Sequence, residues 1–145
     1  VLSKIFSKVY AIDNNIKWMN LNKNYNEKVS NIEYVLLDIY KDIWEILPDD
    51  IEVVFIDADH SYNCCKSDII NSIKRFKNLQ YIIFDDYGVW DGVKNIIEEL
   101  IKKKFLIFET FIGINDVPGP TCIVENTNEG VICSINKGFD FKSII

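Results

Sequence analysis

The sequence predicts an α/β fold, with a mostly parallel sheet and helices on both of its faces. Apolar runs of strand length alternate with amphipathic segments along most of the chain, as in βαβ architectures. The run Ile51–Ile56 is apolar except for Glu52, which is typical of a strand buried on both faces of a parallel sheet. Two short apolar runs near the end predict a C-terminal antiparallel strand pair.

The first strand–helix unit lies near the start of the chain. Residues 9–12 form a short apolar strand that ends in Asp13. Asn14 and Asn15 are good N-caps for a helix that follows them. Residues 20–31 are polar, and we expect this stretch to end in a loop.

The next elements lead to the central strand. Residues 32–37 form a strand that ends in Asp38, and 40–47 predict a short helix that stops at Pro48. The central strand spans 51–57. Residues 61–76 carry the apolar spacing of an amphipathic helix.

The last elements complete the sheet. Residues 81–85 and 105–112 predict strands, and Asp91 caps a helix between them that runs to about Lys104. Residues 121–125 and 130–135 predict an antiparallel hairpin.

Composition limits the classes of function. The chain has 145 residues, a net charge of −6 and no basic tract, so a nucleic-acid partner is not indicated. No apolar run approaches the ~20 residues that span a bilayer, so no membrane partner is expected. The four cysteines lack zinc-ligand spacing and indicate reduced thiols in a cytoplasmic protein. The sequence leaves open whether the chain forms a homo-oligomer.

Acidic residues follow four of the predicted strands. They are Asp13, Asp38, Asp57 and the pair Asp85–Asp86. Ligands of open α/β sheets bind at the carboxyl ends of the strands, so these acids mark a candidate site. Asp13 suits the ribose hydroxyls of a nucleotide cofactor, and Asp38 suits the amine of adenine. Either acid has a structural alternative, because it can also begin the helix or turn that follows.

The acids after the third and fourth of these strands predict a metal site. Asp57, Asp85 and Asp86 offer the oxygen ligands that Mg²⁺ prefers. Asp59 and His60 lie close enough in sequence to take a proton from a metal-bound hydroxyl, and we predict that one of them is the catalytic base. His60 is the only histidine of the chain. Its alternative is a structural role at the start of a helix.

Three segments together resemble a known family. Residues 9–13, 54–62 (with Asp-Ala-Asp-His) and 82–93 (with Asp-Asp-Tyr-Gly) are similar to class I S-adenosylmethionine-dependent methyltransferases. Within that class they most resemble the metal-dependent O-methyltransferases of the macrocin and sugar type, and the catechol and caffeoyl-CoA type is more distant. The resemblance covers nearly all of the chain and implies a Rossmann-like methyltransferase sheet in a single domain over residues 1–145.

The resemblance also implies roles for individual residues. S-adenosylmethionine would contact Asp13, Asn14, Asp38, Ile39 and Asp57. Mg²⁺ would bind Asp57, Asp85 and Asp86, and Asp59 or His60 would be the base. The reaction would move a methyl group from the sulfonium to a hydroxyl of a small molecule or sugar.

The family opens with a strand and a Gly-rich loop that have no counterpart here. The sequence begins at Val1, about where the helix after that loop would end, so we expect an N-terminally truncated version of the fold. Two other functions remain open. One is a nucleotide-sugar glycosyltransferase that holds its metal with Asp57 and Asp59, and the other is a non-catalytic methyltransferase-like remnant.

Overall fold

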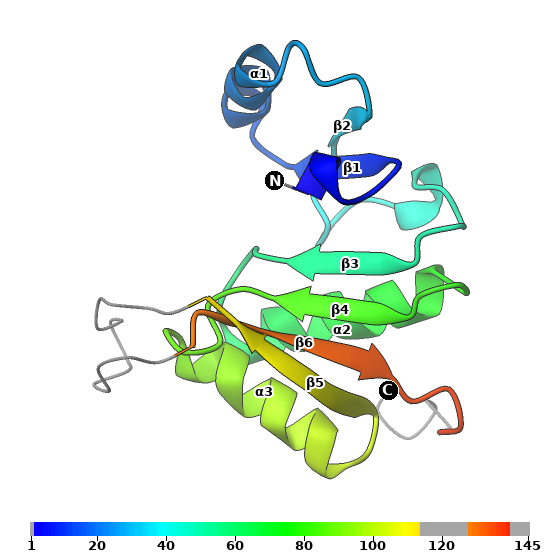
Figure 1. Cartoon of the computed structure of the whole chain (residues 1–145), viewed down its shortest axis with the longest axis vertical. Helices are drawn as coiled ribbons and strands as arrows, with labels where there is room; N and C mark the ends of the chain where they lie inside the picture. The colour runs from blue at the N-terminus through cyan, green and yellow to red at the C-terminus, as the bar shows by residue number, and fades with distance from the viewer. Residues whose placement is uncertain (1, 114–127, 140–145) are drawn as a thin grey trace. The chain divides into compact units, whose positions relative to one another are not determined.

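The computed structural model describes residues 2–113 and 128–139, and the chain divides into two compact units, residues 1–46 and 47–145. Each unit contains an α/β arrangement with its own sheet (Figure 1). The expectation of a single methyltransferase-like domain over the whole chain stays a prediction.

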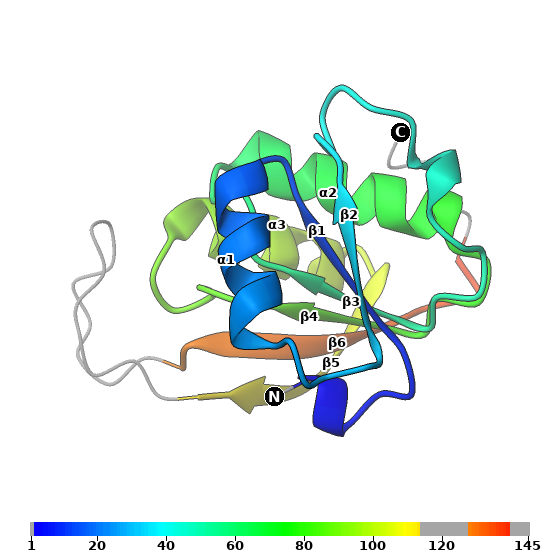
Figure 2. The ribbon, with the colours of Figure 1, turned by 90° about the horizontal axis from the view of Figure 1, so that it is seen from above.

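The first unit is a pair of parallel strands with one helix. Strand β1 (Val9–Asp13) pairs with β2 (Ile32–Leu36), and Asp13 lies opposite Leu36 in the register. Helix α1 (Ile16–Tyr25) connects them and contacts both strands (Figure 2). Single 3₁₀ turns stand at η1 (Leu2–Lys4) and η2 (Trp44–Ile46).

One prediction for this unit was wrong. Helix α1 continues to Tyr25 through a polar stretch that faces solvent, and the loop expected at the end of that stretch follows it. The predicted helix over 40–47, by contrast, is a turn followed by η2. There the Asp42 carboxylate accepts the N–H of Asp38, and the Asp38 carboxylate accepts that of Tyr40. Such side-chain bonds to the backbone compete with helix formation.

The second unit is a four-stranded mixed sheet. Its strands are β3 (Val53–Ile56), β4 (Tyr81–Phe84), β5 (Leu106–Ile112) and β6 (Gly130–Ile135), in the spatial order β3-β4-β6-β5. Strands β3 and β4 run parallel, whereas β6 is antiparallel to both of its neighbours. Parallel strands followed by antiparallel pairing of the C-terminal strand agree with the predicted α/β fold.

The partner of β6 differs from the prediction. We expected residues 121–125 to form a hairpin with 130–135, and residues 121–125 lie outside the described part of the chain. In the described part β6 pairs with β4 and β5. Strand β6 can take the place between two strands because Val131 and Cys133 are fully buried.

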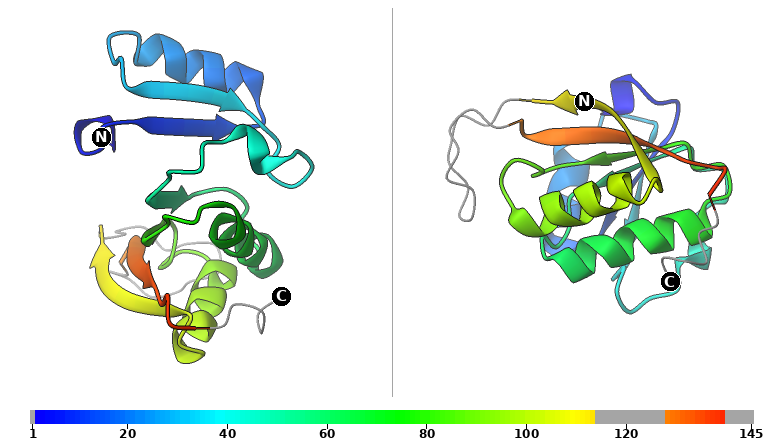
Figure 3. Two further views of the ribbon diagram at one scale, coloured as in Figure 1. Left: turned by 90° about the vertical axis from the view of Figure 1, so that its right-hand side faces the viewer. Right: turned by 90° about the horizontal axis from the view of Figure 1, so that it is seen from below.

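Helices α2 (Tyr62–Arg75) and α3 (Asp91–Lys102) pack side by side on one face of this sheet, as the right-hand view of Figure 3 shows. Their apolar sides supply the core together with β4. Residues with no exposed surface include Ile69, Ile82, Phe84, Ile96 and Ile97. Truncating such a side chain to alanine typically costs about 2–5 kcal/mol, so this layer holds the sheet and its edge in place. Among the described residues no helix is both long and apolar enough to cross a bilayer.

Candidate functional site

The carboxyl ends of β3 and β4 bring three aspartates to one edge of the second sheet. Asp57 follows β3 directly, and Asp85 and Asp86 follow β4. Because the two strands are parallel and in register, their ends meet at the same edge. The N–H of Asp85 donates to the carbonyl of Ile56 over 3.1 Å, which extends the pairing to the edge of the site.

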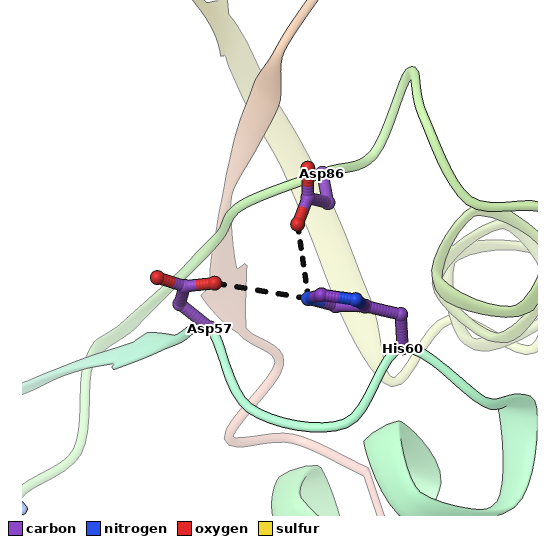
Figure 4. A group of neighbouring side chains, drawn as sticks. All are labelled: Asp57, His60 and Asp86. Atoms are coloured by element: carbon purple, nitrogen blue, oxygen red, sulfur yellow. Dashed lines mark ion pairs between the residues drawn. The ribbon is translucent and has the colours of Figure 1, made fainter. Parts of the chain in front are cut away.

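Three side chains gather at this edge: Asp57, His60 and Asp86 (Figure 4). The Nε2 atom of His60 lies 2.9 Å from Oδ2 of Asp86 and 3.7 Å from Oδ1 of Asp57. One donor atom from each of the three lies within 4.8 Å of the others. Asp85, which the sequence predicted as a metal ligand, is not part of this group, and its Oδ1 accepts the N–H of Asp86.

The His60 ring presents a buried nitrogen to the two carboxylates. Its Nε2 has almost no exposed surface, and it forms ion pairs with Asp86 and Asp57 when the ring is protonated. When the ring is neutral with its proton on Nδ1, an imidazole nitrogen beside two carboxylate oxygens is a set of donors that suits a divalent cation. The residues at this edge therefore offer donors for a divalent cation, with His60 in place of the expected Asp85, and the binding of Mg²⁺ stays a prediction.

The backbone at Asp86 places its carboxylate. Asp86 has a φ of +59°, in the left-handed region where aspartate is among the few tolerated residues. Its carbonyl accepts the N–H groups of Val89 and Trp90, both at 3.0 Å. This closed turn ends the strand sharply and leads into α3.

Helix α3 holds the other side of the site. The Trp90 ring, just before the helix, stacks on the His60 ring with centroids 5.1 Å apart and planes 23° from parallel. At Gly92 an added Cβ would lie 2.4 Å from the His60 carbonyl oxygen and 2.7 Å from the Tyr62 nitrogen. The start of α3 thus touches the backbone of the His60 turn, and only glycine permits that approach. Sequence reasoning missed Gly92, although a glycine at the second position of a helix is a signal of close packing.

The pKa values of Asp57 and Asp86 are raised, which means that the site disfavours their ionised forms. Burial raises the pKa of Asp57, and the neighbouring charges of Asp85 and Asp86 raise it further. Burial also raises the pKa of Asp86, while the nearby His60 acts in the opposite direction. Carboxylates in this situation are stabilised by a cation or a shared proton.

Asp59, one of the two predicted bases, points elsewhere. It is exposed, and its Oδ1 accepts the N–H of Ser61 over 2.9 Å. Hydrogen bonds from the side chain and backbone of Ser61 lower its pKa. A carboxylate that holds its proton less tightly is a weaker base, so the geometry favours His60 over Asp59 for proton transfer.

The predicted cofactor residues of the first unit lie at the carboxyl ends of β1 and β2. Asp13 ends β1 and is half-buried, and its Oδ1 accepts the N–H of Asn15 over 2.7 Å. Asn15, rather than Asn14, caps α1. Asp38 follows β2, and an ion pair with Lys41 at 2.7 Å lowers its pKa.

Two features complete the description of this edge of the first unit. Ile39 is half-buried, and its carbonyl accepts the indole N–H of Trp44. Because β1 and β2 are parallel, Asp13 and Asp38 share one edge of their sheet.

Comparison with known sequences gives one weak relative. No family model matches the chain. An uncharacterized protein of Acanthamoeba polyphaga mimivirus is 35% identical over 75 residues, which cover 47% of this chain and 34% of that protein. The match therefore spans about a third of the relative's length.

Comparison with solved structures identifies the fold. A candidate methyltransferase from Streptococcus mutans, solved in complex with S-adenosylhomocysteine, matches with a TM-score of 0.63 at 14% identity, over 92% of this chain and 79% of that one. An rRNA methylase from Streptococcus thermophilus matches with a TM-score of 0.58 at 12% identity, over 92% and 75% of the two chains. The chain therefore has the Rossmann-like α/β fold of class I methyltransferases, as the sequence predicted.

Proposed function

We propose that this chain is the core of an S-adenosylmethionine-dependent methyltransferase. The observation that carries the proposal is the fold likeness over 92% of the chain to a protein with S-adenosylhomocysteine bound. Acidic residues at the carboxyl ends of β1, β2, β3 and β4 support it, because cofactors of open α/β sheets bind there.

The cofactor is assigned to the strand-end residues that the sequence singled out. Asp13 would accept hydrogen bonds from the ribose, with Asn14 beside it, and Asp38 and Ile39 would flank the adenine. Asp57, at the end of β3 in the second unit, is the further acid that the family resemblance assigns to the cofactor. The lowered pKa of Asp38 supports its part, because an ionised carboxylate is an acceptor for the adenine amine.

The group at the ends of β3 and β4 supports methyl transfer to a hydroxyl. When bound, S-adenosylmethionine supplies an electrophilic methyl group, and a divalent cation, Mg²⁺ in the sequence-based proposal, lowers the pKa of the acceptor hydroxyl. The carboxylates of Asp57 and Asp86, which converge with His60, would hold the cation and so orient the hydroxyl for in-line attack. As the C–O bond formed and the C–S bond broke, His60 or Asp59 would take the hydroxyl proton.

The acceptor is a small molecule or a sugar rather than RNA. Three of the structural neighbours are named as rRNA methylases or methyltransferases, so RNA is the natural alternative. This chain, however, carries a net charge of −6 and gathers carboxylates at the proposed site. Proteins that bind RNA neutralise its phosphates with lysine and arginine, whereas an acidic edge repels those phosphates.

The glycosyltransferase alternative fits the geometry less well. It requires Asp57 and Asp59 to hold one metal, but Asp59 is outside the group formed by Asp57, His60 and Asp86. Its carboxylate instead closes the turn at Ser61.

Calorimetric titration with S-adenosylhomocysteine tests the proposal. We expect binding by the wild-type chain and an affinity at least about tenfold lower in Asp13→Ala, because a hydrogen bond to a charged group contributes roughly 1.5–3 kcal/mol. Glu27→Ala, which removes an exposed acid from the same unit, is the matched control and should bind like the wild type. Binding of UDP or GDP with Mn²⁺, and none of S-adenosylhomocysteine, would instead support a glycosyltransferase.

A further inference from the structure

The lone histidine of the chain turns its Nε2 toward two carboxylates. His60 Nε2 is buried and lies 2.9 Å from Asp86 and 3.7 Å from Asp57, with which it forms ion pairs when the ring is protonated (Figure 4). A neutral ring with its proton on Nδ1 instead presents a lone pair at Nε2. Asp85, by contrast, uses an oxygen to accept the Asp86 N–H and is not among the three converging donors. The site therefore offers one imidazole nitrogen and two carboxylates.

The surroundings of His60 fix that nitrogen in place. Its ring stacks on Trp90, and its carbonyl lies against Gly92 at the start of α3. Ser61 caps α2 immediately afterwards through the N–H of Cys64. A ring held by stacking and a backbone held at both sides lose little freedom on binding a cation, which favours coordination.

The chemistry of the donors selects the kind of cation. Mg²⁺ prefers oxygen ligands and retains several waters, whereas imidazole is a good ligand for first-row transition ions. One imidazole with two carboxylates is therefore a better match for an ion such as Mn²⁺ or Co²⁺ than for Mg²⁺.

We propose that Asp57, His60 and Asp86 together bind a divalent first-row transition ion, with His60 Nε2 as a ligand, in preference to Mg²⁺. The proposal rests on the proposed function only in placing the ion at the same sheet edge. It changes the role of His60, because a nitrogen that coordinates a cation cannot also accept the acceptor's proton through the same lone pair.

Metal titration of the intact chain tests the proposal without an activity assay. We expect calorimetry to show that Mn²⁺ binds at least about tenfold more tightly than Mg²⁺. His60→Gln should weaken Mn²⁺ binding tenfold or more, and Asp57→Asn should do the same at a half-exposed position that tolerates substitution. Asp85→Asn is the matched control: it removes a charge next to the site and should leave Mn²⁺ affinity within about threefold.

The single histidine provides a direct spectroscopic measurement. With Co²⁺ bound, the NMR spectrum should contain one exchangeable imidazole N–H signal shifted far outside the diamagnetic range, because such a contact shift requires coordination of that ring. Its absence with Co²⁺ bound, equal affinities for Mg²⁺ and Mn²⁺, or a larger loss in Asp85→Asn than in His60→Gln would each overturn the proposal. Titration with S-adenosylhomocysteine is scored separately, so failure of the metal site does not count against the methyltransferase.

Discussion

Asp57 and Asp86 are more easily protonated in the folded chain than in an unfolded one. Burial is the main cause for each, and neighbouring carboxylates add to it. An acid whose pKa is raised on folding destabilises the fold above that raised pKa, and the penalty disappears as the pH falls below the ordinary value of 3.8. This is the reverse of the usual behaviour of a paired aspartate.

Asp57→Asn should therefore stabilise the chain at neutral pH. The side chain is half-exposed, so screening keeps the gain at about 0.5 kcal/mol, or roughly 1–3 °C in the melting temperature. Thermal unfolding with a chelator present, at pH 7 and near pH 3.5, measures it. The difference between variant and wild type should shrink at the lower pH, and an unchanged or reversed difference would show that the acids do not repel each other.

Gly92 is the residue on which the contact between α3 and the His60 turn depends. Gly92→Ala should cost about 1–3 kcal/mol of unfolding free energy, because the new Cβ meets backbone that cannot move independently. Gly138→Ala is the matched control, since its Cβ would find only an ordinary 3.5 Å contact with Asn136. Urea denaturation of both variants compares them. Equal stabilities would mean that the start of α3 is not pressed against the site.

Among the elements, α1 depends on a cap that the sequence left ambiguous. Asn15 Oδ1 accepts the N–H of Lys17 at 3.0 Å and that of Trp18 at 3.4 Å. Asn15→Ala should cost about 1 kcal/mol, whereas Asn14→Ala, one residue before the cap, should cost much less. Denaturant unfolding followed by circular dichroism distinguishes the two variants. A larger loss of stability in Asn14→Ala would show that Asn14, and not Asn15, caps the helix.

Elements with a strong periodic pattern could be predicted from the sequence. Helix α2 lies almost where its apolar spacing placed it, with Ser61 as its cap, because an amphipathic stripe and a cap agree. Local signals failed where side chains compete with the backbone, as at Asp38 and Asp42. They also failed for β6, whose position between β4 and β5 depends on contacts distant in sequence.

For the whole molecule, the sequence predicted that acids lie at the carboxyl ends of strands, but not which side chains converge at the ends of β3 and β4. Acids after buried apolar runs indicated the carboxyl ends of the strands, and the structure places them there. The exchange of Asp85 for His60 in the converging group depends on the left-handed turn at Asp86 and on packing against Trp90. Neither is encoded in spacing along the chain.

The central proposal is that S-adenosylmethionine binds at the carboxyl ends of β1, β2 and β3. Titration of the ¹⁵N-labelled chain with S-adenosylhomocysteine, followed by amide chemical shifts, tests it most directly. We expect the largest changes at Asp13–Asn14, Asp38–Ile39 and Asp57, and little change at the opposite strand ends near Val9 and Val53. Saturable changes centred on those opposite ends, or no binding at all, would contradict it.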